Sequence, residues 1–205
     1  MSEATSETSA SERPAPDTSA PDRPASDRSA SAPPAPGLLL VYTGNGKGKT
    51  TAALGLVFRA LGRDLRVAVV QFIKGKWKTG ERRFAETIPG LTFLVMGRGF
   101  TWDSDDLSRD RAAAAAAWAE ARALIEAGQH PVIVLDELTY VMNYGFVPVA
   151  DIVDVLRARP AHVNVVVTGR NAPEALIAAA DLVTEMQSRK HPFEQGRKAQ
   201  IGIDF

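Results

Sequence analysis

Eight consecutive residues, 44–51, have the types and the order that bind phosphate groups. They lie between an apolar run at 38–42 and a helical pattern at 52–61. Glycines let backbone N–H groups surround phosphate oxygens, and the helix that follows directs its positive end at the anion. Lys49 adds a mobile cation, and the Thr50 hydroxyl can bind Mg²⁺. The residues predicted to bind a nucleotide in this loop are Gly44, Asn45, Gly46, Lys47, Gly48, Lys49, Thr50 and Thr51.

The loop departs from the usual pattern at one position. Phosphate-binding loops carry their first glycine five residues before the glycine that corresponds to Gly48, and this sequence has Thr43 there. The alternative interpretation is a chance Gly- and Lys-rich turn between a strand and a helix. The Gly-Lys-Thr-Thr run in the expected strand–helix context favours the phosphate loop. The loop alone does not identify the reaction.

A second feature that suits a nucleotide site is the pair Asp136 and Glu137, which ends an apolar run at 132–135. Ligands of parallel α/β sheets bind at the carboxyl ends of the strands. Carboxylates placed there can hold the metal that bridges the phosphates, directly or through water. The alternative is a pair of solvated acids at a strand end. With a phosphate loop in the same chain, we predict a site for Mg²⁺, or alternatively Mn²⁺, formed by Thr50, Asp136 and Glu137.

The first 36 residues differ in composition from the rest of the chain. They contain almost only Ser, Ala, Pro, Thr, Asp, Glu and Arg. Such a segment buries too little apolar surface to offset the entropy of ordering it. We therefore expect a disordered tail at 1–36 and one nucleotide-binding domain at 37–205. The tail lacks the apolar stretch of a secretory signal, and its acidic residues argue against a transit peptide.

The composition also excludes several kinds of site and partner. The chain has no cysteine, which excludes disulfides, thiolate metal sites and Cys nucleophiles. The tail has six acidic residues and three arginines in a chain of net charge zero, so 37–205 carries about +3. That small excess suits a phosphorylated small molecule and does not argue for nucleic acid. No apolar run reaches the roughly 18 residues of a membrane span. We expect a cytoplasmic protein that binds neither nucleic acid nor a membrane.

Apolar β-branched runs alternate with helical patterns along 37–205. Runs that are apolar on both faces are typical of a parallel sheet covered on two sides. The expected strands are 38–43, 66–72, 91–96, 131–136, 163–168 and 181–185. The expected helices are 49–62, 80–88, 104–127, 147–158 and 173–180, with Asp103 or Ser104 capping the third, Gly128 ending it and Pro173 in the first turn of the last. This alternation predicts an α/β three-layer sandwich with a mostly parallel sheet, the phosphate-loop NTPase (RecA-like) fold.

Seven ordered motifs give the chain a family resemblance over essentially all of 37–205. They are Tyr-Thr-Gly-Asn-Gly-Lys-Gly-Lys-Thr-Thr at 42–51, Val-Gln-Phe-Ile-Lys-Gly at 70–75, Gly-Arg-Gly-Phe-Thr-Trp at 97–102, Asp-Glu-Leu-Thr-Tyr at 136–140, Thr-Gly-Arg-Asn-Ala-Pro at 168–173, Ala-Asp-Leu-Val-Thr-Glu-Met at 180–186 and Lys-His-Pro-Phe at 190–193. Together they resemble the ATP:corrinoid adenosyltransferases of cobalamin biosynthesis. Thr43 in place of the first loop glycine fits the pattern of that family.

The resemblance implies a specific reaction. Such enzymes transfer the 5′-deoxyadenosyl group of ATP to the cobalt of a reduced corrinoid and release triphosphate. The reduced cobalt is the nucleophile, so the protein must position C5′ and stabilise the leaving group. The family binds ATP in reversed polarity along the loop, which would expose C5′. A flavin-dependent reductase and a homodimeric state are implied as well.

The resemblance also implies roles for individual residues. It assigns catalytic roles to Lys49, Glu137, Phe100 and Trp102. In relatives, the aromatic residues of the loop at 97–102 displace the lower axial ligand and leave four-coordinate Co(II), which is easier to reduce. From the residues alone, packing onto a hydrophobic core is the simpler interpretation of Phe100 and Trp102. Arg170, which follows the strand at 163–168, is expected near the phosphates.

Two other functions fit the sequence. A small-molecule kinase or ATPase on the same fold would release ADP instead of triphosphate. A non-catalytic corrinoid escort would bind the adenosylated corrinoid with little turnover. The intact set of Lys49, Thr50, Asp136 and Glu137 argues against a pure binding protein.

Overall fold

One six-stranded sheet organises the molecule. The computed structural model describes residues 35–73, 79–96 and 107–204. The chain divides into two units, Met1–Pro33 and Pro34–Phe205. All described helices and strands belong to the second unit. The strands are β1 (Leu39–Thr43), β2 (Val67–Gln71), β3 (Leu91–Val95), β4 (Val132–Asp136), β5 (Asn164–Thr168) and β6 (Leu182–Glu185). Their order is β3-β2-β4-β5-β1-β6, and every pairing is parallel.

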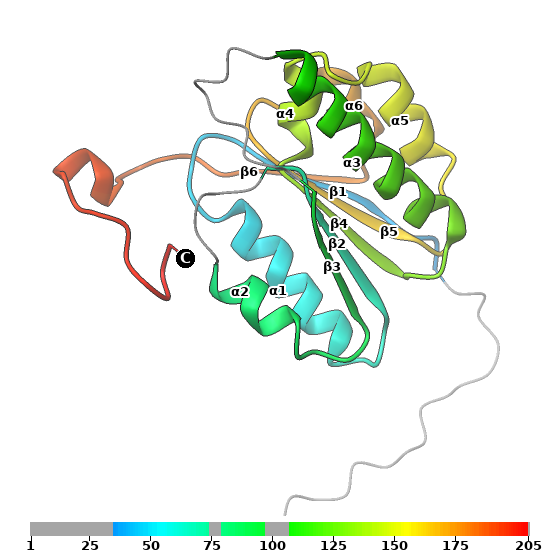
Figure 1. Ribbon diagram of the computed structural model, residues 1–205, viewed down its shortest axis with the longest axis horizontal. Coiled ribbons are helices and arrows are strands. Elements are labelled where there is room, and N and C mark those ends of the chain that lie inside the picture. The colour runs from blue at the N-terminus through cyan, green and yellow to red at the C-terminus, as the bar shows by residue number, and fades with distance from the viewer. Residues whose placement is uncertain (1–34, 74–78, 97–106, 205) are drawn as a thin grey trace, which may run out of the picture. The chain divides into compact units, whose positions relative to one another are not determined.

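Helices cover both faces of this sheet (Figure 1). One face packs against α1 (Lys49–Leu61) and α2 (Gly80–Ala85), and the other against α3 (Leu107–Ala127), α4 (Leu138–Asn143), α5 (Val149–Arg157) and α6 (Glu174–Ala179). A short 3₁₀ helix, η1 (Pro192–Gln195), lies in the C-terminal segment. The described part of the chain is therefore a three-layer α/β sandwich.

The two-residue period of the strands divides the core into two layers. Val67 and Val69 of β2 pack with α1, whereas Ala68 and Val70 face α3 and its neighbours. All five residues of β4 are buried. Burial on both faces explains why β2 and β4 read as continuous apolar runs rather than as alternating ones.

The observed strands and helices lie close to the predicted ones. The larger differences are that α2 ends at Ala85 and that α5 begins at Val149. In addition, α3 begins among the described residues at Leu107, and Pro173 precedes α6 rather than lying within its first turn. The proposed caps of the third helix, Asp103 and Ser104, lie outside the described residues. The helix α4 was not expected, and its six residues show a helical period only weakly.

Two predictions on the chain as a whole have different outcomes. The division into a disordered tail at 1–36 and a domain at 37–205 remains a prediction, because 1–34 lie outside the described residues. None of the helices in the described ranges is long and apolar enough to cross a membrane.

Candidate nucleotide-binding site

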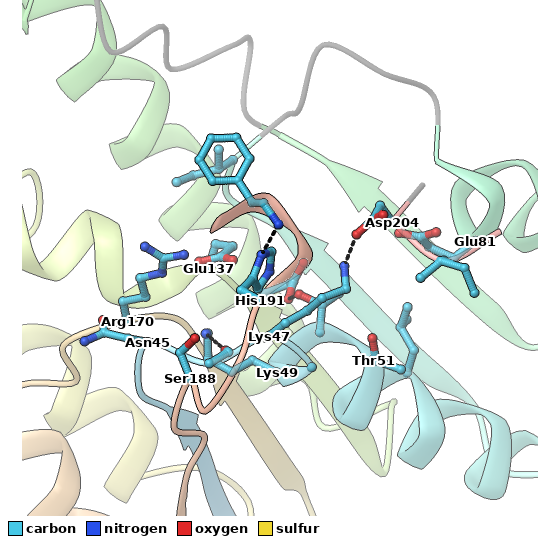
Figure 2. A pocket seen from close by; sticks show the side chains of 18 of the residues that line it. Asn45, Lys47, Lys49, Thr51, Glu81, Glu137, Arg170, Ser188, His191 and Asp204 are labelled. Carbon is cyan, nitrogen blue, oxygen red and sulfur yellow. Dashed lines mark hydrogen bonds and ion pairs between the residues drawn. The ribbon is translucent and has the colours of Figure 1, made fainter. Parts of the chain in front are cut away.

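A pocket of about 1100 Å³ opens at the carboxyl ends of the strands. Ten residues that the sequence predicted for the site line it together (Figure 2). They are Asn45, Gly46, Lys47, Gly48, Lys49, Thr50, Thr51, Asp136, Glu137 and Arg170. Gly44 contributes its carbonyl oxygen to the loop interior. Phe100 and Trp102 lie outside the described residues.

Lys49 is held inside the loop that it belongs to. Its Nζ donates hydrogen bonds to the carbonyl oxygens of Gly44 and Gly46, at 2.8 and 2.7 Å, and the residue is only 7% exposed. Burial lowers the pKa of the Lys49 ammonium, and the nearby Glu137 carboxylate opposes this shift. The ammonium therefore lies in the pocket that the loop encloses, with its direction set by two backbone acceptors.

A second segment packs so closely against the phosphate loop that residues 44 and 46 must be glycine. The backbone at 186–187 comes so close that a Cβ on either glycine would overlap the Met186 carbonyl. The N–H of Gly46 donates to that carbonyl oxygen at 2.6 Å. These glycines thus serve the contact with the segment after β6 as well as access to phosphate.

Asp136 ends β4 in a dense hydrogen-bond network. Its Oδ1 accepts from the hydroxyls of Thr50 at 2.9 Å and Thr168 at 2.7 Å, and its Oδ2 accepts from Gln71 Nε2 at 3.1 Å. The parallel register places Gln71 directly beside Asp136. Burial raises the pKa of the Asp136 carboxyl, and the three hydrogen bonds oppose the shift. The network connects the loop helix, β2, β4 and β5 at a single carboxylate.

Glu137 follows in an unusual conformation. Its φ is +62°, in the left-handed region that non-glycine residues seldom adopt, and its N–H donates to Thr168 Oγ1 at 3.0 Å. Its Oε2 is buried without a hydrogen-bond partner among the described residues. Burial, with the neighbouring Asp136, raises the pKa of Glu137 to about 7. The strained backbone and the unpaired buried carboxylate oxygen of Glu137 suggest that this side chain binds a cation.

Arg170 brings a further positive charge to the pocket. Its side chain extends toward Glu137 (Figure 2). Its charge helps to lower the pKa of Lys49 and offsets part of the rise in the pKa of Glu137. Lys49 and Arg170 therefore bring two positive charges close to Glu137, which suits an anionic ligand.

Sequence reasoning missed two parts of the site. Gln71 belongs to a family-typical motif, but the motif did not indicate a bond to Asp136. The C-terminal segment supplies a whole wall of the pocket, including His191, Phe193, Ile203 and Asp204. The Nδ1 of His191 accepts from the Phe193 N–H at 3.2 Å and caps η1, which agrees with a structural role for this histidine. The signal for the C-terminal wall was weak, since its residues follow no strand or helical period.

The fold and this pocket together define a phosphate-loop nucleotide-binding protein. The family model described as ATP:corrinoid adenosyltransferase BtuR/CobO/CobP matches residues 35–205. The chain therefore belongs to this family.

Similar proteins include the corrinoid adenosyltransferase CobA of Salmonella typhimurium, which is 44% identical over 169 residues, 82% of this chain and 86% of that protein. The corrinoid adenosyltransferase of Pseudomonas aeruginosa is 48% identical over 170 residues, 82% of this chain and 84% of that protein.

A solved structure supports the fold. The flagellar accessory protein FlaH from Methanocaldococcus jannaschii matches with a TM-score of 0.50 and 12% identity, over 74% of this chain and 72% of that one. At this identity the likeness concerns the fold alone. With the parallel sheet, it confirms the predicted fold class.

Proposed function

We propose that this protein transfers the 5′-deoxyadenosyl group of ATP to the cobalt of a reduced corrinoid and releases triphosphate, as a step of adenosylcobalamin biosynthesis. The observation that carries the proposal is membership in the ATP:corrinoid adenosyltransferase family over residues 35–205. The pocket supports it, because the phosphate loop, Glu137 and Arg170 surround one space.

The reaction needs little covalent chemistry from the protein. The Co(I) centre donates an electron pair to C5′, the cobalt–carbon bond forms, and the bond from C5′ to oxygen breaks with its electrons left on triphosphate. The developing negative charge lies on the leaving group, so fixed positive groups lower the barrier. Lys49, Arg170 and the loop N–H groups are the groups placed to do this.

The residues present also fit a divalent cation. Glu137 has a buried carboxylate oxygen without a partner among the described residues, and the Thr50 hydroxyl donates a hydrogen bond to the Asp136 carboxylate. The described residues contain no cluster of three His, Asp or Glu that could hold a metal by itself, so phosphate oxygens would complete the site. We propose that Thr50, Asp136 and Glu137 hold Mg²⁺, which would supply charge neutralisation for the triphosphate.

The other partners follow from the family. The similarity to corrinoid adenosyltransferases of other bacteria supports ATP and a corrinoid as substrates. We propose in addition a flavin-dependent reductase that supplies Co(I), a homodimeric state and a cytoplasmic location. The catalytic roles of Phe100 and Trp102 remain predictions.

One experiment tests the reaction and its alternatives. The protein is incubated with ATP, Mg²⁺ and a chemically reduced corrinoid, and the phosphate product is identified. Triphosphate formed together with an adenosylated corrinoid supports the proposal. ADP would indicate a kinase or ATPase, and tight corrinoid binding without triphosphate would indicate an escort.

A further inference from the structure

Two buried threonine hydroxyls hold the loop that carries Arg170. Thr43 Oγ1 accepts a hydrogen bond from the N–H of Ala172 at 3.1 Å, and Thr139 Oγ1 donates to the carbonyl oxygen of Arg170 at 2.7 Å. Thr43 is 7% exposed and Thr139 is 0% exposed. Arg170 lines the pocket, whereas the two threonines are not among its lining residues. The two hydroxyls therefore contact the backbone of this loop and not the pocket itself.

The backbone on either side of Arg170 is unusual. Gly169 has φ +139° and Asn171 has φ +51°. A Cβ on residue 169 would collide with Thr139 Oγ1, so the close approach of that hydroxyl requires glycine. Such conformations persist only where surrounding contacts over-determine them.

Asn143 adds a third contact to the same loop. Its Nδ2 donates to the Arg170 carbonyl oxygen at 3.2 Å, beside the bond from Thr139. Both donors belong to α4, the helix that begins directly after Glu137. Glu137 and Arg170 are thus held by neighbouring segments, since α4 bonds the Arg170 carbonyl and β1 bonds the N–H of Ala172.

Thr43 gives a physical meaning to the departure from the usual loop pattern. A glycine at this position has no hydroxyl, and the Ala172 N–H would lose its partner. The threonine is the last residue of strand β1. Its hydroxyl adds a hydrogen bond between the start of the phosphate loop and the loop that carries Arg170. The threonine that stands in place of the glycine therefore couples the phosphate loop to the loop that carries Arg170.

We propose that Thr43 and Thr139 are positioning residues that direct the Arg170 guanidinium at the triphosphate group. This inference rests on the proposed function, in which Arg170 neutralises charge on the leaving group. Preorganised cations accelerate such a step because no reorientation is needed as charge develops. Loss of either hydroxyl lets the arginine loop relax and costs catalysis only as long as Arg170 is present.

Double-mutant cycles test the proposal. Thr43→Val and Thr139→Val remove one hydroxyl each at nearly constant shape. We expect each to lower kcat/KM for triphosphate release by roughly tenfold and to weaken binding of inorganic triphosphate by about threefold or more. In an Arg170→Ala background, the same substitutions should change both quantities by less than about twofold. Thr43→Ser and Thr139→Ser, which restore a hydroxyl, should recover most of the loss.

Two further variants serve as control and as safeguard. Thr92→Val removes a hydroxyl that contacts His130 Nε2 at 3.2 Å, near the amino end of β3 and away from the pocket, and should change neither quantity. Asn143→Ala removes a donor to the Arg170 carbonyl at an exposed position, so it folds even where a buried threonine variant does not. Its smaller loss, about threefold, should again vanish without Arg170.

The outcomes separate the inference from the function on which it rests. Effects that persist undiminished in the Arg170→Ala background overturn the inference, because the hydroxyls would then act on the fold at large. A wild-type protein that releases no triphosphate overturns the proposed function. In that case the binding cycle with inorganic triphosphate still decides whether the threonines act through Arg170.

Discussion

Lys47 in the phosphate loop and Asp204 near the C-terminus form an ion pair, with 2.5 Å between Nζ and Oδ1. The two residues lie 157 positions apart in the sequence and on the same pocket wall (Figure 2). The second carboxylate oxygen of Asp204 accepts from the N–H of Gln200 at 2.8 Å. The pair therefore joins the folded C-terminal turn to the loop that binds phosphate.

Asp204→Asn should tighten ATP binding. Without ATP, the Asp204 carboxylate pairs with the Lys47 ammonium. The substitution removes this competing charge, so Lys47 becomes available to the polyphosphate. Both side chains are partly exposed, and such pairs contribute at most about 1 kcal/mol, so the Kd should fall by no more than about fivefold. Calorimetric titration at low and high salt measures the effect, which should shrink as salt screens the pair. The control is Glu194→Gln, which removes a charge from the same wall but leaves the partner of Lys47 intact. Weaker ATP binding by the Asp204 variant would contradict the prediction and would mean that the ion pair holds the pocket wall in place.

Lys49→Ala should abolish turnover and leave the fold intact. The ammonium is the buried cation of the loop, and charge-assisted bonds to phosphate depend on it. We expect triphosphate release to fall to less than about a tenth of the wild-type rate, with thermal unfolding little changed. Arg63→Ala, which removes an exposed cation after α1, is the matched control. A Lys49 variant that kept more than a tenth of the rate would refute the role of this residue.

Glu137→Gln should stabilise the ligand-free protein at neutral and alkaline pH. The folded protein raises the pKa of Glu137 from 4.5 to about 7, so between these values the folded state retains a proton that the unfolded state has lost. The stability of the wild type therefore falls as the pH rises through that window and stays low above it. Relative to the variant, the deficit should approach about 3 kcal/mol near pH 8 and disappear toward pH 4 to 5.

Chemical denaturation without ATP or Mg²⁺, across this pH range, checks the Glu137 prediction. Glu126→Gln, at an exposed carboxylate paired with Arg122, should show no comparable trend. A stability difference independent of pH would contradict the assignment. Glu137→Gln should also lose Mg²⁺-dependent turnover, because a neutral amide replaces the unpaired carboxylate oxygen.

Deletion of residues 1–30 should leave thermal stability nearly unchanged. A segment of this composition buries almost no apolar surface, so its removal costs the folded state little. The melting temperature should move by less than about 5 °C in calorimetry. A larger drop would show that the segment packs on the domain, and the predicted boundary after residue 36 would then be wrong.

Local patterns were sufficient to predict the elements and the two nucleotide motifs. The strands β2 and β4 are continuous apolar runs because both of their faces are buried, and that property is visible in the sequence. The phosphate loop is a run of adjacent residues, so its chemistry can be read without knowledge of the fold. The short helix α4 and the 3₁₀ helix η1 were not predicted, although α2 and α6, also of six residues, were. A run of four to six residues shows a helical period only weakly.

The sequence by itself determined that this chain is an α/β nucleotide-binding protein with Lys49 and Glu137 in its site, since those signals are local. Only the tertiary structure decided which distant groups meet them. Thr43 and Ala172 are 129 positions apart, and Lys47 and Asp204 are farther apart still. Their contacts depend on strand order and register, which place β5 and β6 on either side of β1. Because hydrogen bonds and ion pairs act over a few ångströms, no spacing along the chain could have shown that a C-terminal carboxylate and an arginine loop are attached to the phosphate loop.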